Sequence, residues 1–235
     1  MIYPRVQRLL PAWLHRYILH FDAVLEDAVR DFALPLPDGA RVLDAGAGEA
    51  RHARYFARHR YTPVDLAIGD KTWDYTRLQA LADLTALPFR NASFEAAVNV
   101  VTLEHVREPA QVIRELARVL APGGRLLLVV PHEWEVHQAP HDYFRYTRYG
   151  LEHLLTQAGL QVEALTPVGG YFRLMSRRLL NGLQFFPGLA LPFAAIFLVP
   201  PALILPWFDA LDKDQNFTLG YVCVARKTQT GTSAS

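Results

Sequence analysis

The amino-acid sequence predicts an α/β fold in which helices cover both faces of a mostly parallel sheet. The first observation is that short apolar strands alternate with helical segments along much of the chain. The second is that residues 125–130 form an almost unbroken run of Leu and Val, which is typical of a strand buried on both faces. The third is a glycine-rich turn at residues 46–48, between the first strand and the next helix.

The predicted strands are apolar runs of four to nine residues that are bounded by turn residues. Between them lie longer segments with helical signals. Pro109 stands in the first turn of one such helix, and Gly159 follows the last residues of another. The predicted strands span residues 41–44, 61–66, 94–101, 125–130, 160–166 and 217–225. The predicted helices span residues 21–32, 49–59, 109–120 and 148–158.

The chain divides into four predicted regions. Residues 1–38 are expected to form an N-terminal helical cap, because Leu10, Trp13, Leu14 and Tyr17 recur at helical spacing. Residues 39–169 hold the sheet and its helices. Residues 170–215 form an apolar insertion before the last strand, and they are too many for a simple turn. The last region, 216–235, holds the final strand and a tail expected to be disordered after Arg226.

Composition bounds the class of protein. The 235 residues carry a formal charge of +1, which argues against a dedicated nucleic-acid partner because phosphate recognition needs a clear basic excess. Cys223 is the one cysteine, so no internal disulfide is expected. Pro4, Arg5 and Arg8 interrupt the first apolar residues, so no signal peptide is expected. We therefore expect a cytoplasmic protein.

The strongest local signal lies around the first predicted strand. Asp44 ends that strand, and Gly46 and Gly48 let the backbone of the following turn approach a ligand. Asp65 ends the next strand, where a carboxylate can accept hydrogen bonds from ribose hydroxyls. Glu49 stands near the helix start, where a pyrophosphate would need positive potential. This pattern favours a phosphate-free nucleoside cation, S-adenosylmethionine, over NAD or ATP.

Several further motifs follow in order. They are Ala-Asp-Leu-Thr-Ala-Leu-Pro-Phe at 82–89, Ser-Phe-Glu at 93–95, Thr-Leu-Glu-His-Val at 102–106 and Leu-Ala-Pro-Gly-Gly-Arg-Leu at 120–126. Together with the turn after Asp44, they resemble the class I S-adenosylmethionine-dependent methyltransferases of the small-molecule type. The resemblance covers roughly residues 41–159. It implies a Rossmann-like three-layer sandwich with a mostly parallel seven-stranded sheet. Ala50 and Glu95 depart from the more frequent Gly and Asp of the family.

The resemblance also implies roles for individual residues. The turn after the first strand would line the methionyl end of the cofactor, the residues after the second strand would hold the ribose and flank the adenine, and Asp83 would accept a hydrogen bond from the adenine amino group. The Leu-Glu-His segment would border the transfer site. The implied cofactor-binding residues are Asp44, Ala45, Gly46, Ala47, Gly48, Asp65, Leu66, Asp83, Leu84, Asn99, Val100, Glu104 and His105.

Candidate catalytic residues lie after residue 130, because ligands bind beyond the carboxyl ends of parallel strands. If the acceptor is a hydroxyl, His132 or His141 is the expected general base; the alternative is that both merely hold the loop to the sheet. Tyr143, Arg145 and Tyr146 are candidate substrate contacts, although aromatic clusters often serve packing alone.

No metal site is expected. His137 and His141 stand four residues apart, a spacing that suits a metal on a helix. Pro140 lies between them and argues against a regular helix.

Residues 179–208 contain no charged side chain. Five prolines interrupt the run, so we expect no regular spanning helix. A hairpin entering one leaflet, a lid over the acceptor pocket, an oligomer interface, and buried packing within a soluble enzyme remain open. With the basic N-terminus and Arg173, Arg177 and Arg178 nearby, the pattern favours peripheral contact with the inner face of a membrane.

The predicted function is transfer of a methyl group from S-adenosylmethionine to an oxygen or nitrogen of a small or lipid-linked acceptor. The motif His-Asp-Tyr-Phe-Arg-Tyr-Thr at 141–147 resembles a subset of these enzymes associated with glycan and lipid biosynthesis. Two other classes remain open: a partner subunit that binds the cofactor without catalysis, and an NAD-dependent oxidoreductase, against which the missing third glycine argues.

Overall fold

The computed structural model describes residues 11–70 and 72–228. The chain divides into two compact units. One comprises Asp27–Thr166 and Tyr221–Ser235, and it contains the sheet. The other comprises Met1–Glu26 and Pro167–Gly220, and it is helical in its described part.

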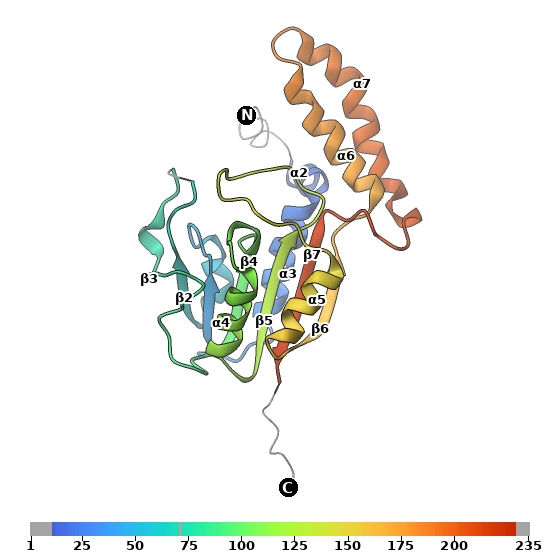
Figure 1. Cartoon of the computed structure of the whole chain (residues 1–235). Helices are drawn as coiled ribbons and strands as arrows, with labels where there is room; N and C mark the ends of the chain where they lie inside the picture. Colours follow the sequence, from blue (N-terminus) through green and yellow to red (C-terminus); the bar gives the residue numbers. More distant parts are fainter. Residues whose placement is uncertain (1–10, 71, 229–235) are drawn as a thin grey trace. The chain divides into compact units, whose positions relative to one another are not determined.

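The sheet has seven strands in the order β3-β2-β1-β4-β5-β7-β6 (Figure 1). All four neighbouring pairs from β3 to β5 are parallel, with Val42 beside both Tyr61 and Ala96. The order reverses at β1, since β2 lies on one side of it and β4 on the other; ligands of open α/β sheets bind at such a switch point. The strands are β1 (Arg41–Ala45), β2 (Arg60–Asp65), β3 (Ala80–Leu81), β4 (Phe94–Val100), β5 (Leu120–Pro131), β6 (Leu160–Pro167) and β7 (Gly220–Lys227).

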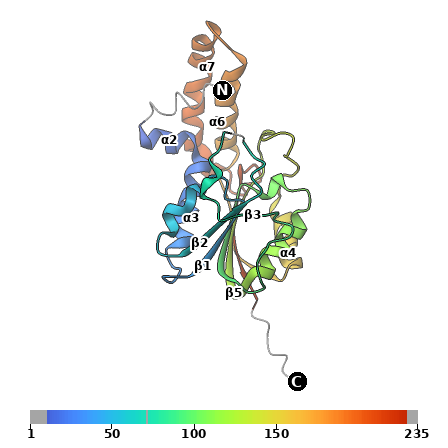
Figure 2. The same cartoon turned by 90° about the vertical axis from the view of Figure 1, so that its left-hand side faces the viewer.

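Helices cover both faces of this sheet, as Figure 2 shows for α4 (Pro109–Val119) on one face and α3 (His20–Ala33) on the other. A further helix, α5 (Arg148–Gln157), adds Leu151 and Leu155 to the core. In α4, Val112, Ile113 and Leu116 recur at helical spacing and have no exposed area, which explains why this segment folds as a helix against the sheet. The predicted seven-stranded, mostly parallel Rossmann-like sandwich is confirmed.

Two local predictions around the sheet were wrong or incomplete. The segment 49–59 is not a full α-helix: it contains one 3₁₀ helix, η1 (Arg51–Phe56), because Ala50 adopts a left-handed φ of 54° and delays the start of the helix. The short strand β3 was not predicted, since two residues give no periodic signal. Two further 3₁₀ helices, η2 (Tyr75–Arg77) and η3 (Leu103–His105), follow β2 and β4.

The second unit contains α2 (Ala12–Ile18), the start of α3, and a helical hairpin made of α6 (Tyr171–Gly182), η4 (Leu183–Phe185), α7 (Ala190–Ile204) and η5 (Leu205–Leu211). Helices α6 and α7 run side by side (Figure 1). Ser176 Oγ donates a hydrogen bond to the Ala202 carbonyl, and Tyr17 of α2 donates one of 2.6 Å to the Leu203 carbonyl. The N-terminal helix therefore packs against the predicted apolar insertion.

The apolar insertion corrects one sequence expectation. Pro200 and Pro201 lie inside α7, and the helical run continues through η5, so that 22 residues, Ala190–Leu211, are long and apolar enough to cross a membrane by length and composition. A proline removes one backbone N–H from a helix but does not have to end it. Only 11% of the most apolar window of this run is buried within the protein. The predicted tail after Arg226 and the first part of the N-terminal helices lie largely outside the described residues.

Candidate active site

The turn after β1 is held from beneath by buried polar groups. Asp44 is 1% exposed, and the Tyr61 hydroxyl of β2 donates a hydrogen bond to its carboxylate. Burial, together with the charge of Asp44, raises the pKa of Tyr61, so this hydroxyl remains a donor. Asn99 of β4 donates a hydrogen bond of 2.7 Å from Nδ2 to the Ala45 carbonyl. These contacts fix the end of β1 between its two neighbouring strands.

Glycine is required at position 46 for two reasons. Its φ is 86°, and a Cβ built there would lie 2.2 Å from Cγ2 of Thr102. Thr102 in turn donates to the Gly46 carbonyl over 3.1 Å. The chain after β4 therefore packs directly against the turn after β1.

The backbone N–H groups of this turn are all used within the protein. Those of Gly46 and Ala47 donate to the Val64 carbonyl at 2.8 and 3.0 Å, and that of Gly48 donates to the Asp65 carboxylate at 3.0 Å. Turns that bind phosphate direct such N–H groups at the ligand. The groups beside this turn are instead the carboxylates of Asp44 and Asp65. It is suited to a ligand without phosphates.

Asp65 links the ends of β1 and β2. Besides Gly48, its carboxylate accepts a hydrogen bond of 2.8 Å from the Ala67 N–H, and a carboxylate still has lone pairs for further donors. Leu66 beside it is 45% exposed, as a residue that flanks a ligand must be. Asp83 also lies at the surface, and its Oδ1 accepts from the Thr85 N–H and hydroxyl.

Leu84 is 5% exposed and Val100 is 7% exposed, so both contribute to packing at this edge. Asn99 Oδ1 is buried and has no partner in the described part of the chain. An orphaned acceptor beneath the turn is consistent with a ligand that brings a donor.

One aromatic contact was missed by sequence reasoning. A Cβ added to Gly48 would lie 3.1 Å from the Trp73 ring, so this ring packs closely against the glycine. Tyr75 packs in turn against Trp73, with ring centroids 6.2 Å apart. These residues follow β2 in a segment without periodic signal. They place an aromatic wall beside Gly48 and Asp65.

The loop 132–147, between β5 and α5, contains the remaining predicted residues. Arg145 holds this loop: it pairs with both carboxylate oxygens of Asp142 at 2.6 and 2.7 Å and donates to the Trp134 and Glu135 carbonyls. This pairing lowers the pKa of Asp142 to about 2. Tyr146 is 5% exposed, and its hydroxyl donates to the Leu103 carbonyl. Both residues anchor the loop, and their roles as substrate contacts stay predictions.

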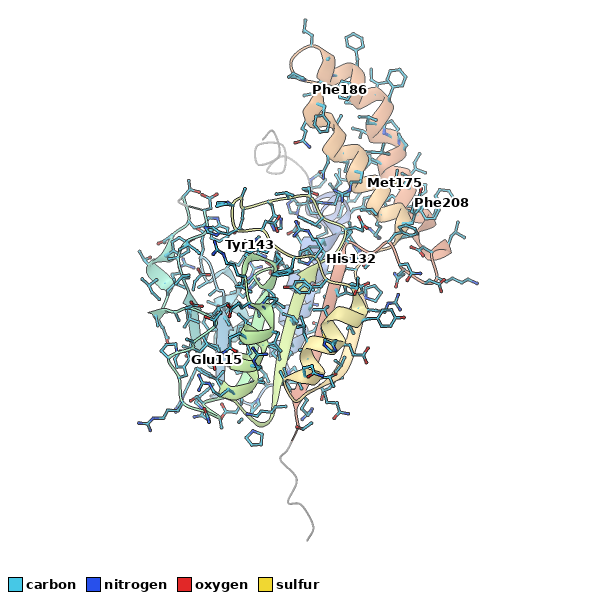
Figure 3. All side chains as sticks on the ribbon, in the orientation of Figure 1. Glu115, His132, Tyr143, Met175, Phe186 and Phe208 are labelled. Atoms are coloured by element: carbon cyan, nitrogen blue, oxygen red, sulfur yellow. The ribbon has the colours of Figure 1, made fainter. Side chains whose placement is uncertain are left out.

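Tyr143 and the two predicted bases lie in the same unit. Figure 3 shows Tyr143 and His132 at the end of the sheet where β5 stops. The Tyr143 hydroxyl lies 3.1 Å from Arg107 Nε and 3.2 Å from His141 Nδ1. The His132 ring packs against Tyr221 with centroids 5.7 Å apart, and its buried Nδ1 has no partner in the described part of the chain. Their roles as general bases stay predictions.

The structure also brings together three residues that the sequence did not connect. Glu104 and His105 of η3 meet His137 of the loop 132–147, and the ligand atoms of the three side chains lie within 4.8 Å of one another. Burial raises the pKa of Glu104 to about 8 and lowers the pKa of His105. Chain order gives no signal for this group, since 32 residues separate His105 from His137.

Comparisons with known proteins agree with this geometry. A sequence model of a methyltransferase domain matches residues 43–128. A ubiquinone biosynthesis O-methyltransferase of Xanthomonas oryzae is 38% identical over 104 residues, which cover 38% of this chain and 42% of that protein. The 27-O-demethylrifamycin SV methyltransferase of Amycolatopsis mediterranei is 32% identical over 133 residues, which cover 48% and 49%. The chain thus spans about half the length or less of these relatives.

Solved structures share the fold at low identity. The 1,6-didemethyltoxoflavin-N1-methyltransferase of Burkholderia thailandensis, solved with bound 1,6-didemethyltoxoflavin and S-adenosylhomocysteine, superposes with a TM-score of 0.56 at 21% identity, covering 88% of this chain and 79% of that chain. The [4+2]-cyclase SpnF superposes with a TM-score of 0.57 at 21% identity, covering 87% and 80%.

The sheet order, the turn after β1 and the matched domain define one class of protein. That class is the methyltransferase domain matched by residues 43–128, in agreement with the resemblance of the motifs to the class I S-adenosylmethionine-dependent methyltransferases.

The contact between Gly46 and Thr102 yields a stability prediction. Gly46→Ala is expected to lower the free energy of unfolding by about 2–4 kcal/mol, because it adds a steric clash to the strain of a positive φ. Gly39→Ala is the matched control: its φ is 77°, but a Cβ there meets nothing within 4 Å, so only the backbone strain remains. Urea denaturation of both variants measures the difference. Equal losses would show that Thr102 does not confine the turn.

Proposed function

We propose that this protein transfers the methyl group of S-adenosylmethionine to a hydroxyl oxygen of an apolar or lipid-linked acceptor. The observation that carries the proposal is the turn after β1, whose N–H groups are used internally while Asp44 and Asp65 surround it with negative charge. Such a site repels phosphate and suits a nucleoside that bears a positive sulfonium. It also disfavours the NAD-dependent alternative.

Two relatives support oxygen as the acceptor atom. One is named a ubiquinone biosynthesis O-methyltransferase, and the other is named a 27-O-demethylrifamycin SV methyltransferase. When bound, the cofactor supplies an activated methyl group. The protein has to hold the acceptor in line, exclude water and accept the proton that the hydroxyl loses. We expect the loop 132–147, which the Arg145–Asp142 pair holds in place, to exclude water. His132 and His141 in that loop are the candidates for the proton acceptor.

The lipid-linked acceptor is supported by the helical hairpin. The side chains at its tip are apolar and exposed: Phe185 is 76% and Leu189 is 87% exposed, and Phe186 lies there as well (Figure 3). Along α7, Phe193, Ile196 and Phe197 are 65–75% exposed. A helix that is apolar on all sides and exposed to water is unfavourable, because a packed core or lipid must cover such a surface.

The charge pattern limits how far the hairpin could enter a bilayer. Arg173, Arg177 and Arg178 lie in the first two-thirds of α6, and charge returns only at Asp209. Ser176 lies beside Ala202, and Arg178 lies two residues nearer the tip, so the uncharged part from the level of Leu179 to Leu189 is about 15 Å long at 1.5 Å per residue. One leaflet of hydrocarbon is about 15 Å thick, half of the bilayer core. We therefore propose contact with one leaflet, with the enzyme on the cytoplasmic face.

Methyl transfer is tested by incubating the purified protein and methyl-labelled cofactor with separate aqueous and lipid fractions of a cell extract. Label is expected in the lipid fraction, and Asp65→Asn is expected to reduce its rate at least tenfold by weakening ribose binding. Asp38→Asn, which changes an exposed carboxylate outside the turn, is the control. Label in the aqueous fraction alone would contradict the lipid-linked acceptor. Cofactor binding without any transfer would instead favour a non-catalytic partner subunit.

Membrane contact is tested by sedimentation with vesicles of phosphatidylcholine and phosphatidylglycerol. The wild-type protein is expected in the pellet. The combined change Phe185→Ser, Phe186→Ser and Leu189→Ser is expected to lower the bound fraction at least fivefold, because it removes the apolar tip. Leu34→Ser with Leu81→Ser, two exposed leucines of the other unit, should bind like wild type. Wild-type protein that stays in the supernatant would refute the contact.

A further inference from the structure

Glu104, His105 and His137 form a buried group to which the proposed methyl transfer assigns no chemical step, and the cofactor-binding role that the motifs imply for Glu104 and His105 stays a prediction. Glu104 follows β4 and has no exposed area, and both of its carboxylate oxygens lack a hydrogen-bond partner in the described part of the chain. Nε2 of His105 and Nε2 of His137 are likewise buried without a partner among the described residues. The two nitrogens lie 3.6 and 3.8 Å from Oε1 of Glu104.

The surroundings of each ring determine which nitrogen carries hydrogen. Nδ1 of His105 lies 2.5 Å from the His141 carbonyl, which can only accept, so Nδ1 carries the hydrogen and Nε2 presents a lone pair.

For His137, Nδ1 lies 3.2 Å from the Glu135 carbonyl and 3.5 Å from Oδ2 of Asp142, two acceptors that favour the same tautomer. Arg145 also approaches this nitrogen, at 3.5 Å, but it donates at shorter distances to Asp142 and Glu135. Nε2 of His137 therefore presents a lone pair as well.

Two imidazole lone pairs and a carboxyl group thus face one another, so the only hydrogen available between them is a proton bound by Glu104. A shared proton would draw an oxygen and a nitrogen to about 2.7–3.0 Å, which is shorter than either observed separation. Two ligand atoms bound at about 2.1 Å to one tetrahedral ion lie roughly 3.4 Å apart. The observed separations of 3.6 and 3.8 Å between the two nitrogens and Oε1 of Glu104 are closer to those of ligands around a metal ion than to those of a shared proton.

We propose that Glu104, His105 and His137 bind a divalent transition-metal ion of the zinc class. Two imidazole nitrogens and one carboxylate oxygen suit Zn²⁺ and leave a fourth position for an exogenous ligand. The partners of each Nδ1 are those that orient metal-binding histidines: a backbone carbonyl for His105, and a carbonyl and a carboxylate for His137. Asp142 is excluded as a ligand, because Arg145 occupies both of its oxygens.

This site differs from the metal pair that the sequence argued against. Residues 137 and 141 do not share a helix in the structure. His141 contributes its backbone carbonyl to orient His105, and His137 joins two residues from the end of a different strand. The site joins η3 to the loop 132–147 without depending on the proposed activity.

Metal binding to the full chain tests the proposal directly. Protein freed of metal with a chelator is titrated with ZnCl₂ by calorimetry, and with CoCl₂ while the visible absorption of tetrahedral cobalt is recorded. We expect one ion per chain, with at least tenfold weaker binding and loss of the cobalt absorption in Glu104→Gln and His137→Ala. Glu152→Gln and His153→Ala, exposed on α5, are matched controls that should bind like wild type.

Circular dichroism establishes that each variant is folded. The binding stoichiometry and the cobalt spectrum are measured on the wild-type protein. The proposal can therefore be tested even if Glu104→Gln does not fold. Absence of one-to-one binding by the wild-type protein would overturn the proposal. So would equal zinc affinity in wild type, Glu104→Gln and His137→Ala, which would indicate an adventitious ion only, held by surface histidines.

Discussion

The structure of the site depends on a carboxylate buried at the end of the central strand. Asp44 is almost wholly removed from solvent between β2 and β4, where a charged group is costly unless donors reach it, and Tyr61 supplies one. Asn99 donates a hydrogen bond to the Ala45 carbonyl, and the Val64 carbonyl accepts hydrogen bonds from the N–H groups of Gly46 and Ala47. The turn is therefore fixed with its donors directed inward. That single constraint distinguishes this site from a phosphate-binding turn and underlies our proposal that it binds an adenosyl sulfonium.

The matched domain ends before the segments in which we propose that the acceptor binds. Residues 43–128 include the end of β1, all of β2 and β4, and the turns that follow these strands, whereas the loop 132–147 and the α6–α7 hairpin lie beyond them. A [4+2]-cyclase and an N-methyltransferase share the fold at similar TM-scores, so the sheet alone does not determine the reaction. Under our proposal the substrate depends on the two segments that follow β5, one carrying polar and aromatic side chains and the other almost purely apolar.

Much of this could be predicted because the signals are local. Leu126–Val130 reads as a buried strand in any context, and Asp44 and Asp65 each follow such a run. What failed was decided by tertiary contacts or backbone conformation. Ala50 adopts a left-handed φ, and the 3₁₀ helix η1 forms where an α-helix was predicted. Pro200 and Pro201 were expected to interrupt a helix, but both lie inside α7. The meeting of Glu104 with His137 required η3 and a distant loop to fold together, which no spacing along the chain encodes.

Isothermal titration of the purified protein with S-adenosylhomocysteine, and separately with NADH, tests the central claim most directly. The inward-directed N–H groups predict one-to-one binding of the nucleoside, with a heat that disappears in Asp65→Ala, and no measurable heat with the dinucleotide. The absence of a binding heat with S-adenosylhomocysteine, or binding of NADH with comparable affinity, would show that the turn after β1 does not select against phosphate.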